Sequence, residues 1–244
     1  MKLPRVSLLS AFALFVVAAS LAKADPVIFY DGDPNGGLTY DMHVYSITGA
    51  YESFRDWAYS DFTVPLGQTW TLTSMFGNFA NADPNAATII PNFQYEIRTG
   101  MSGSNGGTLV DSDTGLSAAS TDQGYQVGGW EAYGYSVNLT SPVTLPGGTT
   151  YWLALIPISL NGYNVGLQTT SNANSVNSPN DQSSEFLTWD YLDPTDVYSS
   201  LPDDFSVGVR GTVAIVPEPA SAAILLVPAL ALLTRRRRAA QRFE

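Results

Sequence analysis

The sequence predicts an all-β protein, an antiparallel β-sandwich of jelly-roll-like form. Three observations lead to this prediction. Apolar and polar side chains alternate in several short runs, Gly, Pro, Asn and Asp separate the runs, and residues 25–215 lack the apolar spacing of an amphipathic helix. Alternation with a period of two puts every second side chain on one face of a strand, so that one face packs on a core.

The predicted strands follow one another along the domain. Alternation of apolar or aromatic with polar residues covers the ranges 38–47, 69–76, 93–98, 133–139 and 205–213. Residues 151–158 differ because they are apolar almost throughout, as expected of a central strand covered on both faces. They follow Pro146-Gly147-Gly148, a turn that we expect to pair them with residues 143–145 as a hairpin.

Two stretches interrupt this pattern. Residues 100–107 (GMSGSNGG) are predicted to form a flexible loop between strands. Residues 171–184 are polar and nearly free of large side chains, so they are predicted to be mobile or to lie at a binding edge. No internal repeat or second domain is visible.

Residues 1–24 are predicted to be a secretory signal peptide. Two basic residues precede an apolar run over residues 6–21, and Ala22 and Ala24 supply the small side chains of a signal-peptidase site. An uncleaved N-terminal anchor is the alternative, which the short run and the small-x-small site disfavour. Cleavage after Ala24 leaves residues 25–215 as the folded domain.

A second targeting segment is predicted at residues 216–238. Pro217 and Pro219 hold the backbone around Glu218 extended and accessible. An apolar run over residues 220–234 follows. It ends at four basic residues, which resist crossing a membrane: Arg235, Arg236, Arg237 and Arg238.

The apolar run is short for a transmembrane helix. Its length corresponds to about 22 Å as a helix, against about 30 Å of hydrocarbon. Pro228, near its middle, weakens the helix further. An ordinary single-pass anchor and a buried helix of a globular domain are the alternatives, and the arginines disfavour the second. Residues 239–244 are then expected to be a cytoplasmic tail.

The order of these parts, a Pro217-Glu218-Pro219 motif, an apolar run and a basic stop, resembles the PEP-CTERM sorting signal of Gram-negative bacteria. The resemblance implies that a membrane peptidase, an exosortase, processes the chain near the motif. It also implies a location at the cell surface or in an exopolysaccharide matrix. Residues 57–62, 65–70 and 147–153 are similar to segments of many exported proteins of this kind, whose ectodomains look like β-sandwiches and largely lack an assigned activity.

The predicted domain is strongly acidic. It holds 20 acidic residues against Arg55, Arg98 and Arg210, a formal charge of −17. Such a surface repels nucleic acid and anionic lipid, which argues against both as partners. The chain has no cysteine, and a domain of this size has a core large enough to do without disulfides.

A calcium loop is one candidate site. Asp31, Asp33 and Asn35 place oxygen ligands at alternate positions with Gly36 behind them, as at the start of an EF-hand loop. The twelfth position is Met42, which cannot supply the usual bidentate carboxylate. A plain turn rich in Asp, Asn and Gly is the alternative, and no other cofactor is expected.

Catalysis has little support in the sequence, and we expect a protein that is not an enzyme. The single histidine, His43, lies on a predicted strand, and no Gly-x-Ser-x-Gly motif accompanies any serine. A secreted hydrolase remains an alternative because glycoside hydrolysis needs only two suitably spaced carboxylates. The glutamates considered for such a pair are Glu52, Glu96, Glu131 and Glu185.

Carbohydrate binding is the second functional hypothesis. Exposed aromatic rings stack on sugar faces, and Trp130 and Trp189 lie where the sequence favours exposure. Burial of both rings is the alternative.

The first functional hypothesis is an exported, non-enzymatic surface or matrix protein. Its expected partners during sorting are signal peptidase, an exosortase-type peptidase and the inner membrane. Extracellular polysaccharide is a possible ligand.

Overall fold

The computed structural model describes the chain in eight stretches that cover most of the predicted domain. These are residues 24–41, 43–46, 53–82, 90–159, 165–179, 181, 184–190 and 193–216. Several predictions fall outside them: the leader up to residue 23, Glu52, Met42, and everything from Pro217 onward, which includes the sorting motif, the apolar run and the arginines.

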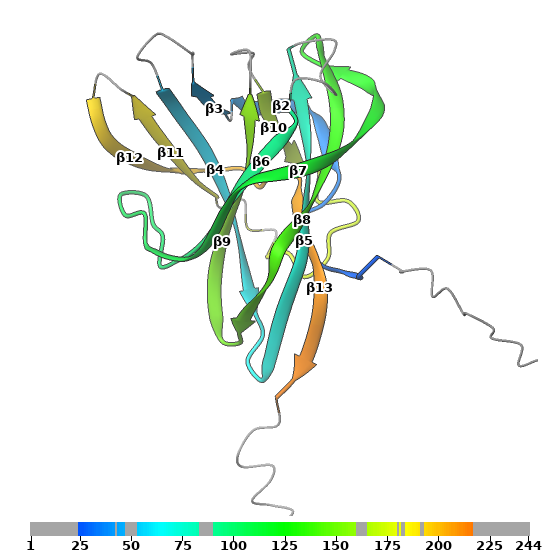
Figure 1. Cartoon of the computed structure of the whole chain (residues 1–244), viewed down its shortest axis with the longest axis vertical. Helices are drawn as coiled ribbons and strands as arrows, with labels where there is room; N and C mark the ends of the chain where they lie inside the picture. Colours follow the sequence, from blue (N-terminus) through cyan, green and yellow to red (C-terminus); the bar gives the residue numbers. More distant parts are fainter. Residues whose placement is uncertain are drawn as a thin grey trace, which may run out of the picture.

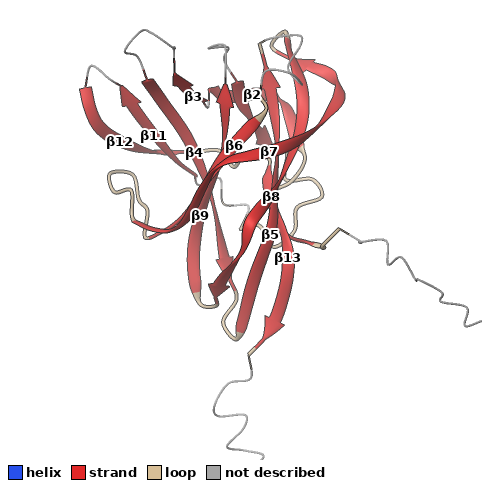
Figure 2. Cartoon of the chain, viewed as in Figure 1, coloured by secondary structure: helices blue, strands red, loops and turns tan. Residues whose placement is uncertain are grey.

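Within these stretches the prediction of an all-β protein is confirmed (Figure 2). No helix of the described residues is long and apolar enough to cross a membrane. The strands are β1 (Val27–Tyr30), β2 (Pro34–Asp41), β3 (His43–Ser46), β4 (Ser53–Val64), β5 (Gln68–Asn81), β6 (Asn92–Thr99), β7 (Thr108–Val127), β8 (Trp130–Pro146), β9 (Thr149–Ser159), β10 (Val165–Thr170), β11 (Ser184–Asp190), β12 (Asp193–Leu201) and β13 (Val207–Ile215).

The strands form one curled sheet in the order β1-β13-β5-β8-β7-β6-β9-β3-β4-β11-β12, with β10 joined to β5 and β2 to β10 (Figure 1). The strand pairs are antiparallel except β3 with β9, which run parallel. β9 also pairs directly with β4, so it lies inside the sheet as a central strand. Its apolar composition fits this position, and the prediction for residues 151–158 is confirmed.

β7 connects the two halves of the sheet. Its residues 108–117 pair with β6, and its residues 118–127 pair with β8. The first half therefore holds β1, β13, β5, β8, β10 and β2, and the second holds β6, β9, β3, β4, β11 and β12. Because one long strand belongs to both halves, the sheet is continuous through β7 and curls over at that strand.

The core lies where the halves face each other, and aromatic rings fill it. Phe62 of β4 stacks on Trp70 of β5 with ring centroids 5.7 Å apart, and on Phe29 of β1 at 4.8 Å. Phe79 of β5 meets Phe93 of β6 edge-on at 5.5 Å. These rings are fully buried, and removing such a ring from a core costs about 3–5 kcal/mol.

One predicted pairing is wrong. The turn at Pro146-Gly147-Gly148 connects β8 to β9, but these strands do not pair with each other: β8 pairs with β5 and β7, whereas β9 pairs with β6, β3 and β4. The chain crosses here from one half of the sheet to the other. Gly147 allows the crossing because its Cα lies against the backbone of the β4–β5 turn, where a Cβ would be 2.2 Å from the Pro65 carbonyl oxygen.

Both predicted loops connect strands. Residues 100–107 join β6 to β7, and Ser102 and Asn105 form a small bridge within them. The polar stretch that begins at Ser171 joins β10 to β11, and its described part is tied to β1. There Tyr30 and Val176 exchange two backbone hydrogen bonds, of 2.9 and 2.8 Å.

Candidate functional site

A polar groove of about 560 Å³ lies where the end of β1, the start of β2, β5 and the β7–β8 hairpin meet. Its walls carry phenols, carboxamides and carboxylates. The lining residues are Tyr30, Asp33, Pro34, Asn35, Gly36, Asn78, Thr121, Asp122, Gln123 and Tyr125. We call this surface the polar groove.

A bulge in the β7–β8 hairpin shapes one wall of the polar groove. The pairing register shifts between Asp122 and Gln126, and Gly124 takes a positive φ of 72° there. The Gly124 amide donates to the Asp122 carboxylate at 2.7 Å, which closes the turn. The bulge lets Gln123 reach Asn78 on β5 and Tyr125 reach Gln168 on β10, with a 3.0 Å hydrogen bond to the latter.

Asn78 organises the floor of the groove. Its Nδ2 donates to the Tyr30 hydroxyl at 3.1 Å and to Ser206 Oγ at 2.7 Å, while its Oδ1 accepts a hydrogen bond from Gln123 Nε2. The Tyr30 hydroxyl in turn donates to Asp33 Oδ1 at 3.2 Å. Burial raises the pKa of Tyr30 to about 12, so the phenol stays neutral at physiological pH. The groove is therefore preorganised by a hydrogen-bond network that needs no ion.

Among the residues that the structure describes, no cationic side chain lines the polar groove, whereas Asp33 and Asp122 are both acidic. Anionic ligands such as phosphates would be repelled there. Carboxylates and carboxamides offer paired hydrogen-bonding atoms, and phenol rings offer flat apolar faces. Together these groups suit a neutral ligand that carries many hydroxyl groups.

The three residues of the predicted calcium loop take different partners. Asp31 is 1% exposed, and its Oδ1 accepts from Ser178 Oγ at 2.8 Å. Asp33 lies in the polar groove, and Asn35 donates to Thr169 at 2.7 Å while Pro34 already begins β2. In the part of the chain that the structure describes, no group of three or more His, Cys, Asp or Glu is placed to hold a metal ion. The calcium site stays a prediction.

Asp31 belongs instead to a set of buried acids. Burial raises its pKa well above the ordinary value, and Asp204 and Asp61 push in the same direction. Burial also raises the pKa of Asp61 to about 7, with further contributions from the carboxylates of Asp181, Asp204 and Glu185. Asp61 is therefore partly protonated near neutral pH, which no pattern in the sequence indicates.

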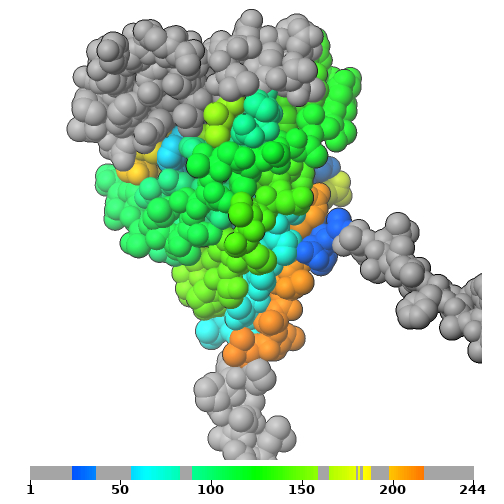
Figure 3. All heavy atoms as spheres, in the orientation of Figure 1, coloured from blue at the N-terminus to red at the C-terminus, as the bar shows by residue number. Residues whose placement is uncertain are grey.

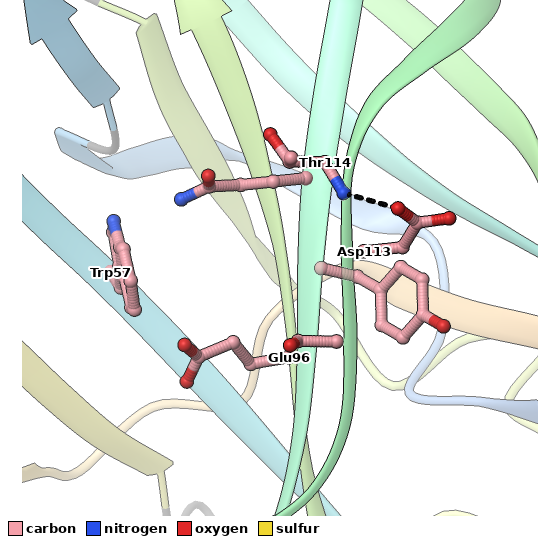
Figure 4. Close-up of a pocket in the computed structure, with 7 residues that line it drawn as sticks. Trp57, Glu96, Asp113 and Thr114 are labelled. Carbon is pink, nitrogen blue, oxygen red and sulfur yellow. Dashed lines mark hydrogen bonds between the residues drawn. The ribbon is translucent and has the colours of Figure 1, made fainter.

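A second hollow, of about 260 Å³, lies over β4, β6 and β7, and its lining includes one of the candidate glutamates, Glu96, together with Asp113 (Figure 4). In this view the Glu96 carboxylate turns toward Trp57, whereas the Asp113 carboxylate lies on the other side of the strand. Glu96 accepts hydrogen bonds from Tyr59 at 3.0 Å and from Arg98, with which it forms an ion pair at 2.5 Å.

The carboxylates that the structure describes in this hollow do not favour the general acid of a glycosidase. Hydrogen bonds from Thr140 and the Thr114 amide lower the pKa of Asp113, but a general acid needs a raised pKa. Glu96 is already engaged by a guanidinium and a phenol. Glu131 accepts from Gln126 at 2.5 Å, and Glu185 accepts from Ser200 at 2.9 Å. Among the described residues, the candidate glutamates are thus held by neighbouring side chains.

The predicted carbohydrate platforms are placed differently from each other. Trp130 begins β8 and is half-buried, packed against a small cluster of Ala80, Val127 and Ala132. Trp189 lies on β11, where its backbone pairs with Arg55 on β4. Trp130 does not line the polar groove. Sequence reasoning missed the groove, although an isolated glycine such as Gly124 within a strand pattern can indicate a bulge.

A scan of protein-family models found no match, and a search of curated proteins found no significant relative.

Proposed function

We propose that this chain is an exported, non-enzymatic β-protein, of sandwich and jelly-roll-like form, that acts at the cell surface or in the extracellular matrix. Residues 1–24 direct export, and residues 216–238 act as a PEP-CTERM-type signal read by an exosortase-type peptidase. The inner membrane holds the chain during sorting. Nucleic acid is not a partner, because the body is too acidic.

One observation carries this proposal: the fold fills the interval between the two targeting segments. Asp25, the first residue after the expected cleavage site, accepts a 2.7 Å hydrogen bond from Thr73 of β5. At the other end, β13 finishes at Ile215, and the Val216 amide donates to the Gly67 carbonyl at 2.7 Å. The described strands therefore extend from just after the expected cleavage site to just before the proposed sorting motif.

Fractionation of the native host with mass spectrometry of both termini tests this proposal. We expect a mature chain that begins at Asp25 and is found in the envelope or the medium. Replacing Pro217, Glu218 and Pro219 with alanine should make an unprocessed form accumulate at the membrane. Full-length chain in the cytosol, with its leader attached, would show that the proposal is wrong.

Carbohydrate binding is the second candidate function, and the polar groove favours it. The groove combines Tyr30 and Tyr125 with carboxamides and carboxylates, and none of its described lining residues is cationic. Neutral sugars need this combination, because hydroxyl groups pair with amides and carboxylates while C–H faces pack on rings. The groove, rather than Trp130 or Trp189, is therefore the site to which we assign a glycan.

A panel of neutral oligosaccharides, measured by glycan array and calorimetry, tests this assignment. We expect Tyr125→Ala and Asp122→Ala to weaken binding at least tenfold, because both side chains line the groove. Trp130→Ala is the matched control and should leave binding unchanged. Loss of binding with Trp130→Ala alone would place the site elsewhere, and turnover of a glycoside would favour the hydrolase alternative.

A further inference from the structure

One end of the molecule carries no charge. It is formed by residues 63–69 around the β4–β5 turn, residues 143–150 around the β8–β9 turn and residues 211–216 at the end of β13, and none of them is Asp, Glu, Lys, Arg or His. We call this end the uncharged tip. It is the narrow lower end in Figures 1 and 3, where β13 meets both turns.

Hydrogen bonds join the three segments of the uncharged tip into one surface. The Gly148 amide donates to the Val64 carbonyl at 2.8 Å, and the Val216 amide donates to the Gly67 carbonyl at 2.7 Å. The hydroxyl groups of Thr63 and Thr150 lie 2.8 Å apart. The tip is therefore part of the rigid sheet and not a loose end.

Several apolar side chains of this tip are exposed to solvent. Leu66 is 78% exposed, Ile215 81%, Val216 50% and Val213 42%. Among the described residues only two other large apolar side chains are exposed, Leu109 and Val110 on β7. Apolar groups gathered on a surface mark a contact site, and here they gather where an otherwise strongly acidic domain has no charge.

We propose that the uncharged tip rests on the surface of a lipid bilayer. This rests on the proposed function, in which residues 220–234 enter the membrane. Only Pro217, Glu218 and Pro219 separate Val216 from that run. A fully extended chain covers at most about 3.6 Å per residue, so Val216 lies within about 14 Å of the hydrocarbon boundary. The headgroup layer itself is roughly 6 Å thick, so Val216 lies at most about 8 Å beyond its outer edge.

Two further features favour a bilayer. The apolar run over residues 220–234 is about 8 Å shorter as a helix than the hydrocarbon core is thick. A helix that is too short to span the core brings the residues before it, and with them the domain, closer to the membrane. An acidic surface is repelled by anionic headgroups, whereas an uncharged one with exposed Leu and Ile side chains can enter the interface. A second copy of the chain is a weaker occupant, because four aliphatic side chains fall well short of the roughly 20 residues that a stable interface uses on each side.

Site-specific labelling tests the proposal, and the chain suits it because it has no cysteine. The full chain with Leu66→Cys, labelled with an environment-sensitive fluorophore, is reconstituted into phosphatidylcholine vesicles with and without nitroxide-labelled lipid. Ser120→Cys is the matched control. Ser120 is exposed, and it pairs with Tyr135 of β8, which in turn pairs with Gly77 of β5. Gly77 lies nine residues along β5 from Gln68 in the tip, so Ser120 is about 30 Å from the tip.

We expect the probe at position 66 to shift to shorter wavelength and to lose at least half of its emission to the nitroxide lipid, and the probe at position 120 to do neither. Ile215→Cys should behave like Leu66→Cys. If the chain floats with vesicles but the probes at positions 66 and 120 respond alike, the tip proposal is wrong while anchoring stands. A shift that depends on protein concentration and not on nitroxide lipid would assign the tip to a second copy. A chain that fails to float with vesicles would overturn both the anchoring and the tip proposals.

Discussion

Asn78 is the residue on which the polar groove depends most. It is nearly buried, and it joins Tyr30, Ser206 and Gln123 through one carboxamide. Truncating it would remove the donor that the Tyr30 and Ser206 oxygens share. Buried polar groups that lose a partner cost about 1–3 kcal/mol each because they were already removed from water.

We therefore expect Asn78→Ala to lower the free energy of unfolding by about 2 kcal/mol, measured by urea titration. Ser104→Ala, an exposed change in the β6–β7 loop, is the control and should stay within about 0.5 kcal/mol. An Asn78→Ala chain as stable as the parent would mean that the network around Tyr30 contributes nothing to stability.

Asp61 gives the domain an unusual dependence on pH. Its pKa in the fold is about 7, above the ordinary value near 3.8, so the folded state binds the proton more tightly than the unfolded state does. The resulting stability is fully present below the ordinary pKa and is lost as pH rises toward 7. Asp31, whose pKa is also raised, acts with the same sign.

The melting temperature should therefore fall between pH 5 and pH 8, and Asp61→Asn should make this fall smaller. Asp113→Asn is a suitable control because the pKa of Asp113 is lowered. The contribution of Asp113 to stability therefore changes with pH only below pH 5. Thermal unfolding of the parent chain, Asp61→Asn and Asp113→Asn at pH 5 and pH 8 measures these differences. A parent chain that becomes more stable toward pH 8 would contradict the assignment.

At the scale of elements, the β8–β9 connection decides how the two halves of the sheet are joined. Gly147 lies so close to the β4–β5 turn that a Cβ would be 2.2 Å from the Pro65 carbonyl oxygen and 2.5 Å from that of Gln68. Both atoms are backbone, so they cannot move away cheaply. The turn and the strands that it connects must shift together if a side chain is added.

Gly147→Ala should consequently destabilise the domain by about 1–3 kcal/mol or more, as overpacking does. Gly134→Ala on β8 is the matched control, since a Cβ there meets its nearest atoms at 3.5 Å. It should cost less than about 1 kcal/mol, the usual penalty of small changes in a strand. Equal unfolding midpoints for the two variants would show that the close approach at Gly147 is not constrained.

At the scale of the whole molecule, charge is distributed unevenly. The domain carries a formal charge of −17, yet the uncharged tip has none of it, and the described lining of the polar groove holds acids but no cation. Self-repulsion of this kind weakens a compact state and is reduced by salt, because the Debye length falls from about 30 Å at 0.01 M to about 8 Å at 0.15 M.

The melting temperature should accordingly rise between 0.01 and 0.15 M NaCl. At matched ionic strength CaCl₂ should raise it by the same amount, because the side chains of Asp31, Asp33 and Asn35 already have other partners. An additional rise with calcium that Asp33→Asn removes would support the predicted calcium loop instead.

Local pattern was enough to predict that the domain is built of strands, and that residues 151–158 lie inside the sheet. Alternation and apolar runs depend only on neighbouring residues and on which faces are buried, so one sequence contains them. Local pattern also predicted the two targeting segments, because their basic, apolar and motif residues follow one another along the chain. These predictions fall almost entirely outside the described residues.

The tertiary structure alone decided which strands pair and which side chains meet. Pro146-Gly147-Gly148 fits a hairpin and a crossing equally well, and only the packing of the two halves selects the crossing. Tyr30, Asn78 and Gln123 share one groove because β1, β5 and β7 are neighbours in space, while more than 40 residues separate each from the next along the chain. A sequence specifies period and local turn chemistry directly, whereas long-range contacts are fixed by the sum of packing over the whole core.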